Sequence, residues 1–205
     1  MTVKAKRLWV GITGSLGAGK STVSRVFQDA GYPIFSADLI AREVVQPGGT
    51  ALAEIGRVFG AGALLPDGSL DRAWMREAIA KDPARRRTLE AITHPLIRAR
   101  SRELAEAEFA KGARIVFYEA PLLFEASSEA ALDAVICVAA EEGTRIARVV
   151  KRDGSSPAQA KALIDAQIPQ DEKIRRSQYV IWNDGSEEMV REEARKVLSA
   201  LLALT

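Results

Sequence analysis

Short apolar runs alternate along the chain with longer segments in which apolar residues recur at helical spacing. Five of these runs have the composition of β-strands but lack a strict alternation of apolar and polar positions. Strands of that kind are typical of a parallel sheet that is buried on both faces. The sequence therefore predicts an α/β protein with a doubly wound, five-stranded parallel sheet flanked by helices, and its predicted strands are residues 8–12, 33–36, 115–118, 135–138 and 179–181.

The first predicted strand leads directly into a glycine-rich loop, which fills every fixed position of the phosphate-binding P-loop pattern. Its glycines let the backbone turn so that successive N–H groups face inward, and the helix that follows adds the positive end of its dipole. We expect Lys20 to reach the terminal phosphates and the Ser21 hydroxyl to hold Mg²⁺. The predicted nucleotide-binding residues of the loop are Gly14, Leu16, Gly17, Ala18, Gly19, Lys20, Ser21 and Thr22.

Two helical regions interrupt the predicted sheet. Residues 39–112 form a longer crossover than sheet geometry requires, contain no convincing strand, and are interpreted as an inserted helical lobe. Residues 148–177 carry arginines and are broken at Gly154 and Pro157, which predicts a mobile lid. The remaining residues, 1–38, 113–147 and 178–205, are predicted to form the core of a single domain.

Composition limits the class of protein. The chain has 205 residues, a formal net charge of +2 and one cysteine. Such a small charge gives no reason to expect nucleic acid as a partner, and a single cysteine excludes an internal disulfide. Cys137 lies in an apolar run and is read as a small core residue. No segment approaches the roughly 20 apolar residues of a membrane span, so we expect a soluble, cytoplasmic protein without a membrane partner.

Asp38 is the first candidate for chemistry outside the loop. It follows the second predicted strand, and ligands of doubly wound sheets bind at the carboxyl ends of the strands. A carboxylate there can accept the proton of an alcohol that attacks a phosphoryl group. The position equally suits an N-cap for a helix over residues 39–45. Both roles remain open on spacing alone.

Two further candidates are a pair of arginines after the fourth predicted strand and a glutamate at the end of the third. Arg148 and Arg152 are four residues apart, so both can face one phosphate from the same side of a helix, although surface arginines serve mostly for solubility. Glu119 ends the third predicted strand, where P-loop proteins often place a carboxylate that holds a magnesium-bound water.

His94 is the only histidine, so it cannot build a metal site without other ligands. It follows a predicted helix over residues 84–93. It is either a packing residue at the end of that helix or a group that touches substrate.

Several segments, in this order, resemble the dephospho-coenzyme A kinase family. They cover nearly the whole chain, and the His-Pro and Pro-Leu-Leu segments are not general features of P-loop kinases. The matching segments are residues 11–22, 37–42, 47–48, 59–60, 67–72, 94–98 and 121–125, together with Arg148, Arg152, Gln167 and Asn183. The resemblance implies a P-loop fold like that of nucleoside monophosphate kinases. It also implies ATP-dependent phosphorylation of the ribose 3′-hydroxyl of dephospho-coenzyme A, the last step of coenzyme A synthesis.

The resemblance also implies roles for individual residues. Asp38 becomes the general base, Arg148 and Arg152 contact phosphate, and His94 belongs to the substrate-binding lobe. Arg42 and Arg98, which are similarly placed, would meet the pyrophosphate of the acceptor, and Asn183 would lie against the adenine, as the corresponding corner does in P-loop kinases. The sequence departs from the family at two positions, since Ser36 stands where an aspartate is frequent and Glu119 stands where aspartate is commoner.

Two alternative functions remain from the sequence. A nucleotide-dependent switch would use the same loop, but the Asn-Lys-x-Asp motif of guanine-nucleotide switches is absent from the sequence. A kinase of the same fold acting on another small alcohol or nucleotide is the second alternative. Activity with dephospho-coenzyme A distinguishes the three.

Overall fold

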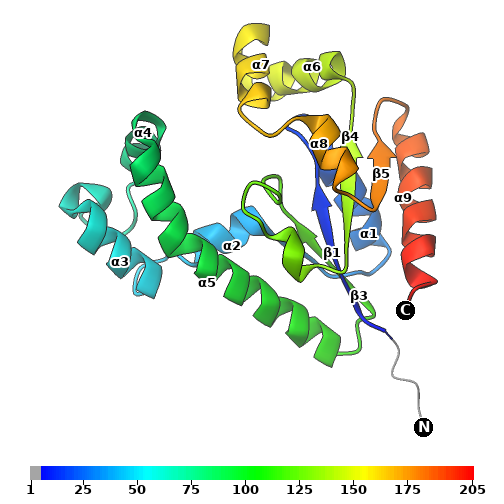
Figure 1. The fold of residues 1–205 in the computed structure, drawn as a ribbon, viewed down its shortest axis with the longest axis horizontal. Helices are drawn as coiled ribbons and strands as arrows, with labels where there is room; N and C mark the ends of the chain where they lie inside the picture. Colours follow the sequence, from blue (N-terminus) through cyan, green and yellow to red (C-terminus); the bar gives the residue numbers. More distant parts are fainter. Residues whose placement is uncertain (1–5) are drawn as a thin grey trace. The chain divides into compact units, whose positions relative to one another are not determined.

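The computed structural model describes residues 6–205 and divides into two compact units (Figure 1). The first unit contains the described residues up to Ser36 together with Ala105–Thr205, and the second contains Ala37–Leu104. The division at residues 104 and 105 falls within helix α5 (Pro83–Ala110). The predicted boundaries of core, lobe and lid stay a prediction.

The first unit is built on one sheet of five parallel strands in the order β2-β3-β1-β4-β5. In the central pairings, Ile12 of β1 is level with Glu119 of β3 and with Ile136 of β4. This arrangement confirms the predicted fold class. The strands are β1 (Leu8–Thr13), β2 (Ile34–Ser36), β3 (Ile115–Glu119), β4 (Ala134–Ala139) and β5 (Tyr179–Trp182).

Helices cover the sheet and bury its apolar side chains. Helix α1 (Lys20–Asp29) lies beside the C-terminal helix α9 (Glu187–Leu202) in Figure 1. The ring of Phe27 stacks on that of Phe117 with centroids 4.4 Å apart, which joins α1 to β3. The Ser186 hydroxyl accepts a hydrogen bond from the Met189 N–H at the start of α9, as its capping pattern predicts.

Burial differs among the strands. Nearly every residue of β1, β3 and β4 is buried, whereas β2 and β5 are only partly buried. The expectation that all five strands are buried on both faces is therefore wrong for these two. The physical reason is their place at the two edges of the sheet, where each has a neighbour on one side only.

The predicted lid region consists of three helices rather than two. They are α6 (Glu142–Asp153), α7 (Pro157–Asp165) and the short α8 (Gln170–Arg175). Gly154 ends α6 in the left-handed conformation, at φ 65°. Ser156 then begins α7 with a capping box in which the Ser156 and Gln159 side chains each accept from the other's backbone N–H.

The second unit is helical and has a core of its own. Buried Val45, Ile55 and Met75 pack with partly buried side chains such as Trp74. The carboxylate of Asp71 caps α4 (Arg72–Lys81) by accepting from the N–H groups of Ala73 and Trp74. Its elements are α2 (Ala37–Glu43), α3 (Thr50–Phe59), η1 (Ala61–Ala63), α4 (Arg72–Lys81) and most of α5.

Helix α5 does not end before His94, which corrects the prediction of a helix over residues 84–93. It continues through Pro95 to Ala110. A proline inside a helix removes the hydrogen bond to the carbonyl four residues earlier, here that of Ala91. Ala91 and Pro95 are both exposed, so water can satisfy that carbonyl.

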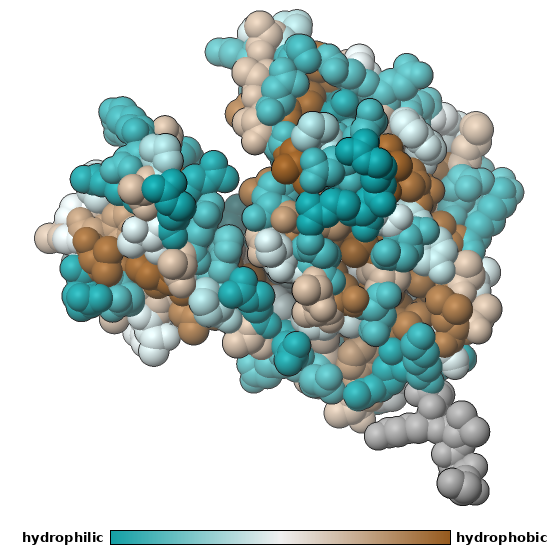
Figure 2. Space-filling model, viewed as in Figure 1, coloured by the Kyte–Doolittle hydropathy of each residue, from teal (hydrophilic) through white to brown (hydrophobic). Residues whose placement is uncertain are grey.

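Hydrophilic residues predominate on the face drawn in Figure 2, with smaller hydrophobic areas between them. None of the helices within residues 6–205 is long and apolar enough to cross a membrane.

Candidate active site

The three glycines of the P-loop are needed because the loop lies against neighbouring backbone and side chains. A Cβ added at Gly14 would lie 2.2 Å from the Val138 carbonyl oxygen, and one added at Gly17 would lie 2.5 Å from that of Arg145. At Gly19 it would lie 2.0 Å from Nδ2 of Asn183. These contacts seat the loop between the ends of β4 and β5 and the start of α6.

Lys20 begins helix α1 and turns back over the loop. Its ammonium group donates to the carbonyl oxygens of Gly14, at 2.9 Å, and Ser15, at 3.2 Å. A lysine held there presents a positive charge at the mouth of the concave loop. This is where a P-loop lysine contacts the terminal phosphates of a nucleotide.

Arg148 and Asn183 meet on the other side of the loop. Arg148 Nη2 donates to the Asn183 carbonyl oxygen at 2.8 Å, and Asn183 Nδ2 donates to the Ala18 carbonyl oxygen at 2.8 Å. The Arg148 Nη1 group also approaches the carbonyl oxygens of Gly17 and Ala18, at 3.4 Å each. The structure thus brings two predicted site residues from α6 and the end of β5 onto the P-loop.

Arg152 does not lie with them. Its guanidinium pairs with its neighbour Asp153, with Nε at 2.6 Å from Oδ1 and Nη2 at 2.8 Å from Oδ2. The pair stabilises both charges, because it raises the pKa of Arg152 and lowers that of Asp153. Arg152 is free to serve a phosphate only after it leaves this carboxylate.

Glu119 lies at the end of β3 and contacts the first helix. Its Oε2 accepts a hydrogen bond of 2.6 Å from the Ser24 hydroxyl, one turn beyond Ser21 on α1. Hydroxyl and carboxylate oxygens are the donors that Mg²⁺ prefers. No cluster of three or more potential metal-ligating side chains occurs within residues 6–205, so a metal here would depend on phosphate oxygens and water for its other ligands.

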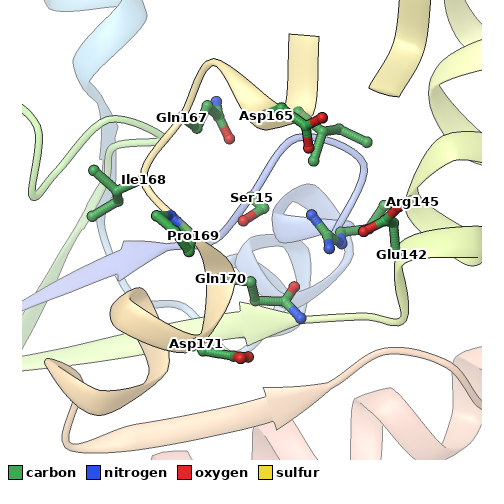
Figure 3. A pocket seen from close by; sticks show the side chains of 10 residues that line it. Ser15, Glu142, Arg145, Asp165, Gln167, Ile168, Pro169, Gln170 and Asp171 are labelled. Carbon is green, nitrogen blue, oxygen red and sulfur yellow. The ribbon is translucent and has the colours of Figure 1, made fainter. Parts of the chain in front are cut away.

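The base of the lid region is joined to the P-loop by Gln167, which the sequence analysis matched to the family without a role. Its side-chain oxygen accepts a hydrogen bond of 2.9 Å from the Leu16 N–H. Beside it lies a cavity of about 340 Å³ (Figure 3). The segment from Gln167 to Asp171 lines one side of this cavity, and Glu142 and Arg145 line another.

Lys173 is a buried charge that the sequence analysis missed. Its side chain on α8 is completely buried and donates to the Pro121 carbonyl oxygen at 2.9 Å. The same ammonium group pairs with Glu125 Oε1 at 2.9 Å. In the sequence, Lys173 lies in a charged segment that reads as a solvated helix face, and no local pattern marks it as buried.

Cys137 lies in the interior of β4, as expected from its apolar neighbours. Burial raises the pKa of its thiol to about 11, although the positive charges of Lys173 and Lys20 oppose the rise. The thiol is therefore neutral at physiological pH, which supports its role as a core residue.

Asp38 and Arg42 belong to the second unit. Both are exposed on α2, where a spacing of four residues puts them on one face of the helix. Asp38 is the second residue of this helix, so the alternative N-cap role is wrong. Its carboxylate in the first turn still interacts favourably with the helix dipole.

His94 and Arg98 share a face of α5 in the same unit. Burial lowers the pKa of His94, the negative charge of Glu90 opposes this, and the positive charge of Arg98 adds to it. Helix α5 is also joined to α2, because Arg100 Nε lies 2.7 Å from Glu43 Oε1. The second unit thus carries all four predicted acceptor-binding residues on two connected helices.

Comparison with known proteins matches most of the chain to one family. A family model described as dephospho-CoA kinase matches residues 8–188. The dephospho-CoA kinase of Anaeromyxobacter dehalogenans is 43% identical over 192 residues, covering 94% of this chain and 91% of the relative. That of Syntrophotalea carbinolica is 42% identical over 195 residues, covering 95% and 92%.

Solved structures agree with the sequence relatives. A crystal structure from Thermus thermophilus has a TM-score of 0.83 at 35% identity and covers 98% of this chain and 99% of its own. The dephospho-CoA kinase from Campylobacter jejuni has a TM-score of 0.72 at 29% identity, with coverages of 95% and 97%. A shikimate kinase from Acinetobacter baumannii, at 16% identity and a TM-score of 0.52 with coverages of 97% and 95%, shares the fold.

The parallel sheet, the glycine loop at the end of β1 and the basic helix beside it define a P-loop kinase. Such enzymes are transferases that take a phosphoryl group from ATP. The chain belongs to the dephospho-CoA kinase family, whose reaction is the final step of coenzyme A biosynthesis.

Proposed function

We propose that this chain phosphorylates the ribose 3′-hydroxyl of dephospho-coenzyme A with ATP, and that one set of its residues binds ATP while another set binds the acceptor. The main support for ATP binding is the hydrogen-bond network of Arg148, Asn183 and Ala18. It holds the guanidinium of Arg148 and the side-chain amide of Asn183 beside the P-loop. In this proposal the loop binds the triphosphate, Asn183 lies next to the adenine, and Arg148 contacts phosphate.

Transfer of the phosphoryl group develops negative charge that fixed cations stabilise. Lys20 serves this purpose from the P-loop, and Arg148 serves it from α6. Arg152 joins them when it exchanges the carboxylate of Asp153 for a phosphate oxygen. The close spacing of Arg148 and Arg152 on α6 supports this role, since one ligand can accept from both.

Magnesium fits the donor set at the start of α1. The Ser21 hydroxyl would bind the ion directly, and Glu119 would hold a water molecule of its coordination sphere. The hydrogen bond between Glu119 and Ser24 supports this assignment because it fixes the carboxylate beside α1. The ion supplies charge neutralisation on the phosphate oxygens when bound.

The acceptor half of the proposal rests on the second unit. Asp38 accepts the proton of the attacking hydroxyl, while Arg42 and Arg98 bind the pyrophosphate of the acceptor. His94 positions the acceptor from the face of α5 that also carries Arg98. Exposure of Asp38 and Arg42 on one helical face supports this, because both side chains are available to a ligand.

A coupled assay of ADP release tests the proposal. The chain is given ATP with dephospho-coenzyme A, and separately with ATP and other acceptors such as shikimate, gluconate or nucleoside monophosphates. We expect ADP release that depends on dephospho-coenzyme A. Hydrolysis that is indifferent to the acceptor, or a preference for another alcohol, would reject the proposed substrate.

A further inference from the structure

Lys173 makes an unusual set of contacts for a lysine. Its side chain has 0% exposure, and its ammonium group contacts Glu125 Oε1 and the Pro121 carbonyl oxygen, each at 2.9 Å. Removal of an ammonium group from water is costly unless it is paired and hydrogen-bonded, so this group lies where its partners hold it. Both partners belong to the segment that follows β3.

Each of the two partners of Lys173 is connected to the P-loop or to the residue before it by further hydrogen bonds. Glu125 Oε1 also accepts from the Ile168 N–H at 3.3 Å, and the preceding residue, Gln167, accepts from the Leu16 N–H at 2.9 Å. On the other side, the Pro121 carbonyl oxygen also accepts from the Thr13 hydroxyl at 3.4 Å. Thr13 is the last residue of β1, immediately before the loop.

These contacts form one continuous network of hydrogen bonds and an ion pair among three segments. It joins the P-loop, the segment after β3, and the junction between α7 and α8 together with α8 itself. Lys173 lies on α8, and its ammonium group is completely buried where it contacts the segment after β3. The second oxygen of Glu125, Oε2, is buried and has no hydrogen-bond partner within residues 6–205. Lys173 is therefore the principal compensation for the charge of Glu125.

We propose that Lys173 is a positioning residue for nucleotide binding, which acts through Glu125 and Ile168 to hold the Gln167 side chain against the Leu16 N–H. A loop that is already fixed loses less conformational entropy when it binds a ligand, so it binds more tightly. This inference rests on the proposed function only in that the P-loop binds an adenine nucleotide. The acceptor does not enter it.

The test measures the affinity of the full chain for ADP by titration calorimetry, without an acceptor. Lys173→Met and Gln167→Ala are each expected to weaken ADP binding by about fivefold, the factor that one hydrogen bond typically supplies. The combined Lys173→Met/Gln167→Ala variant is expected to bind no more weakly than Lys173→Met alone, because both changes release the same contact.

Lys173→Met alone leaves a buried carboxylate without a cation and is expected to lower the melting temperature. The variant Lys173→Met/Glu125→Met separates folding from positioning, because apolar side chains of similar volume commonly replace a buried ion pair without loss of stability. We expect this variant to regain the wild-type melting temperature while its ADP affinity stays low. Lys161→Met is the matched control, because Lys161 lies on α7 and pairs with Glu142 and Asp165 while remaining about half exposed.

Recovery of ADP affinity together with the melting temperature would overturn the proposal and leave Lys173 as a stabilising residue. Gln167→Ala binding ADP as tightly as the wild type would also overturn it. Failure of the proposed substrate is a separate outcome, because it would abolish acceptor-dependent ADP release and leave these binding measurements unchanged.

Discussion

The guanidinium of Arg148 and the carbonyl oxygen of Asn183 are joined by a hydrogen bond of 2.8 Å, although the two residues lie 35 positions apart in the chain. This contact connects α6 to the end of β5. The Asn183 side chain then reaches the Ala18 carbonyl oxygen. A residue of the predicted lid region is thereby held at the P-loop.

Replacement of Arg148 by alanine is expected to lower kcat/KM for ATP by about a hundredfold, the usual effect of removing one group that stabilises developing charge. The steady-state assay with dephospho-coenzyme A measures this change. Arg195→Ala is the control, because Arg195 is an exposed arginine on α9 that pairs with Glu188. Equal effects of the two substitutions would contradict the role of Arg148.

Gly19→Ala is expected to destabilise the protein by more than the roughly 1–2 kcal/mol that a left-handed backbone costs an alanine. Gly19 has φ +87°, and its added Cβ would also meet the Asn183 side chain at 2.0 Å. Thermal unfolding measures the loss. Gly31→Ala is a matched control, because Gly31 has the same φ but its Cβ would meet nothing within 4 Å. A loss of stability no greater than that of Gly31→Ala would show that the contact with Asn183 does not contribute to the destabilisation.

The stability of the protein is expected to fall as pH decreases through about 6.5 because of His94. Burial lowers the pKa of His94 in the folded protein, so the unfolded chain takes up a proton first as the pH falls. Above about pH 6.5 the free energy of unfolding does not depend on the titration of His94. Below that pH the free energy of unfolding decreases, because the unfolded chain binds the proton more tightly than the folded protein does. Denaturant unfolding at several pH values between 5 and 8 measures the slope.

His94→Asn is the control for that pH dependence, and His94 is the only histidine of the chain. We expect the variant to show a flat profile between pH 7 and pH 5.5, above the range where most carboxylates titrate. An unchanged profile in the variant would assign the pH dependence to other groups.

Cys137 is expected to resist alkylation in the folded protein. Its pKa of about 11 leaves only about a thousandth of the thiol as reactive thiolate at pH 8, and the side chain is buried. Mass spectrometry after iodoacetamide treatment should find the native protein unmodified and the denatured protein fully modified. Rapid modification under native conditions would contradict the burial of β4.

The fold and the position of the P-loop could be predicted from sequence because their signals are local. Apolar runs located all five strands to within one residue at each end, and the P-loop pattern located the glycine-rich loop between β1 and α1. The shape of helix α5 was not predictable in the same way. Pro95 is a signal for a helix boundary, but the helix continues through it, at a place where Ala91 and Pro95 are exposed and water can satisfy the Ala91 carbonyl.

The contacts that hold the site together were beyond the sequence because they join distant segments. Lys173 and Glu125 are 48 positions apart in the chain. Lys173 looks like an ordinary surface charge among charged neighbours, and Glu125 follows an apolar segment that does not show which cation it meets. Gln167 was matched to the family, but its hydrogen bond to the Leu16 N–H depends on how α7 and α8 return to the core. Only the folded chain brings such pairs together.

Asp38 carries the central claim of the account, that a carboxylate on α2 takes the proton of the acceptor hydroxyl. The direct test is the turnover of Asp38→Asn with ATP and dephospho-coenzyme A, measured with ADP affinity on the same preparation. Arg42→Gln provides a second variant of the same helix face, in which acceptor KM is expected to rise with a smaller change in kcat.

For Asp38→Asn we predict unchanged ADP affinity and a kcat that is lower by about two to four orders of magnitude, the usual contribution of a general base. A kcat within a few fold of the wild type would contradict the account, because the reaction would then proceed without this carboxylate.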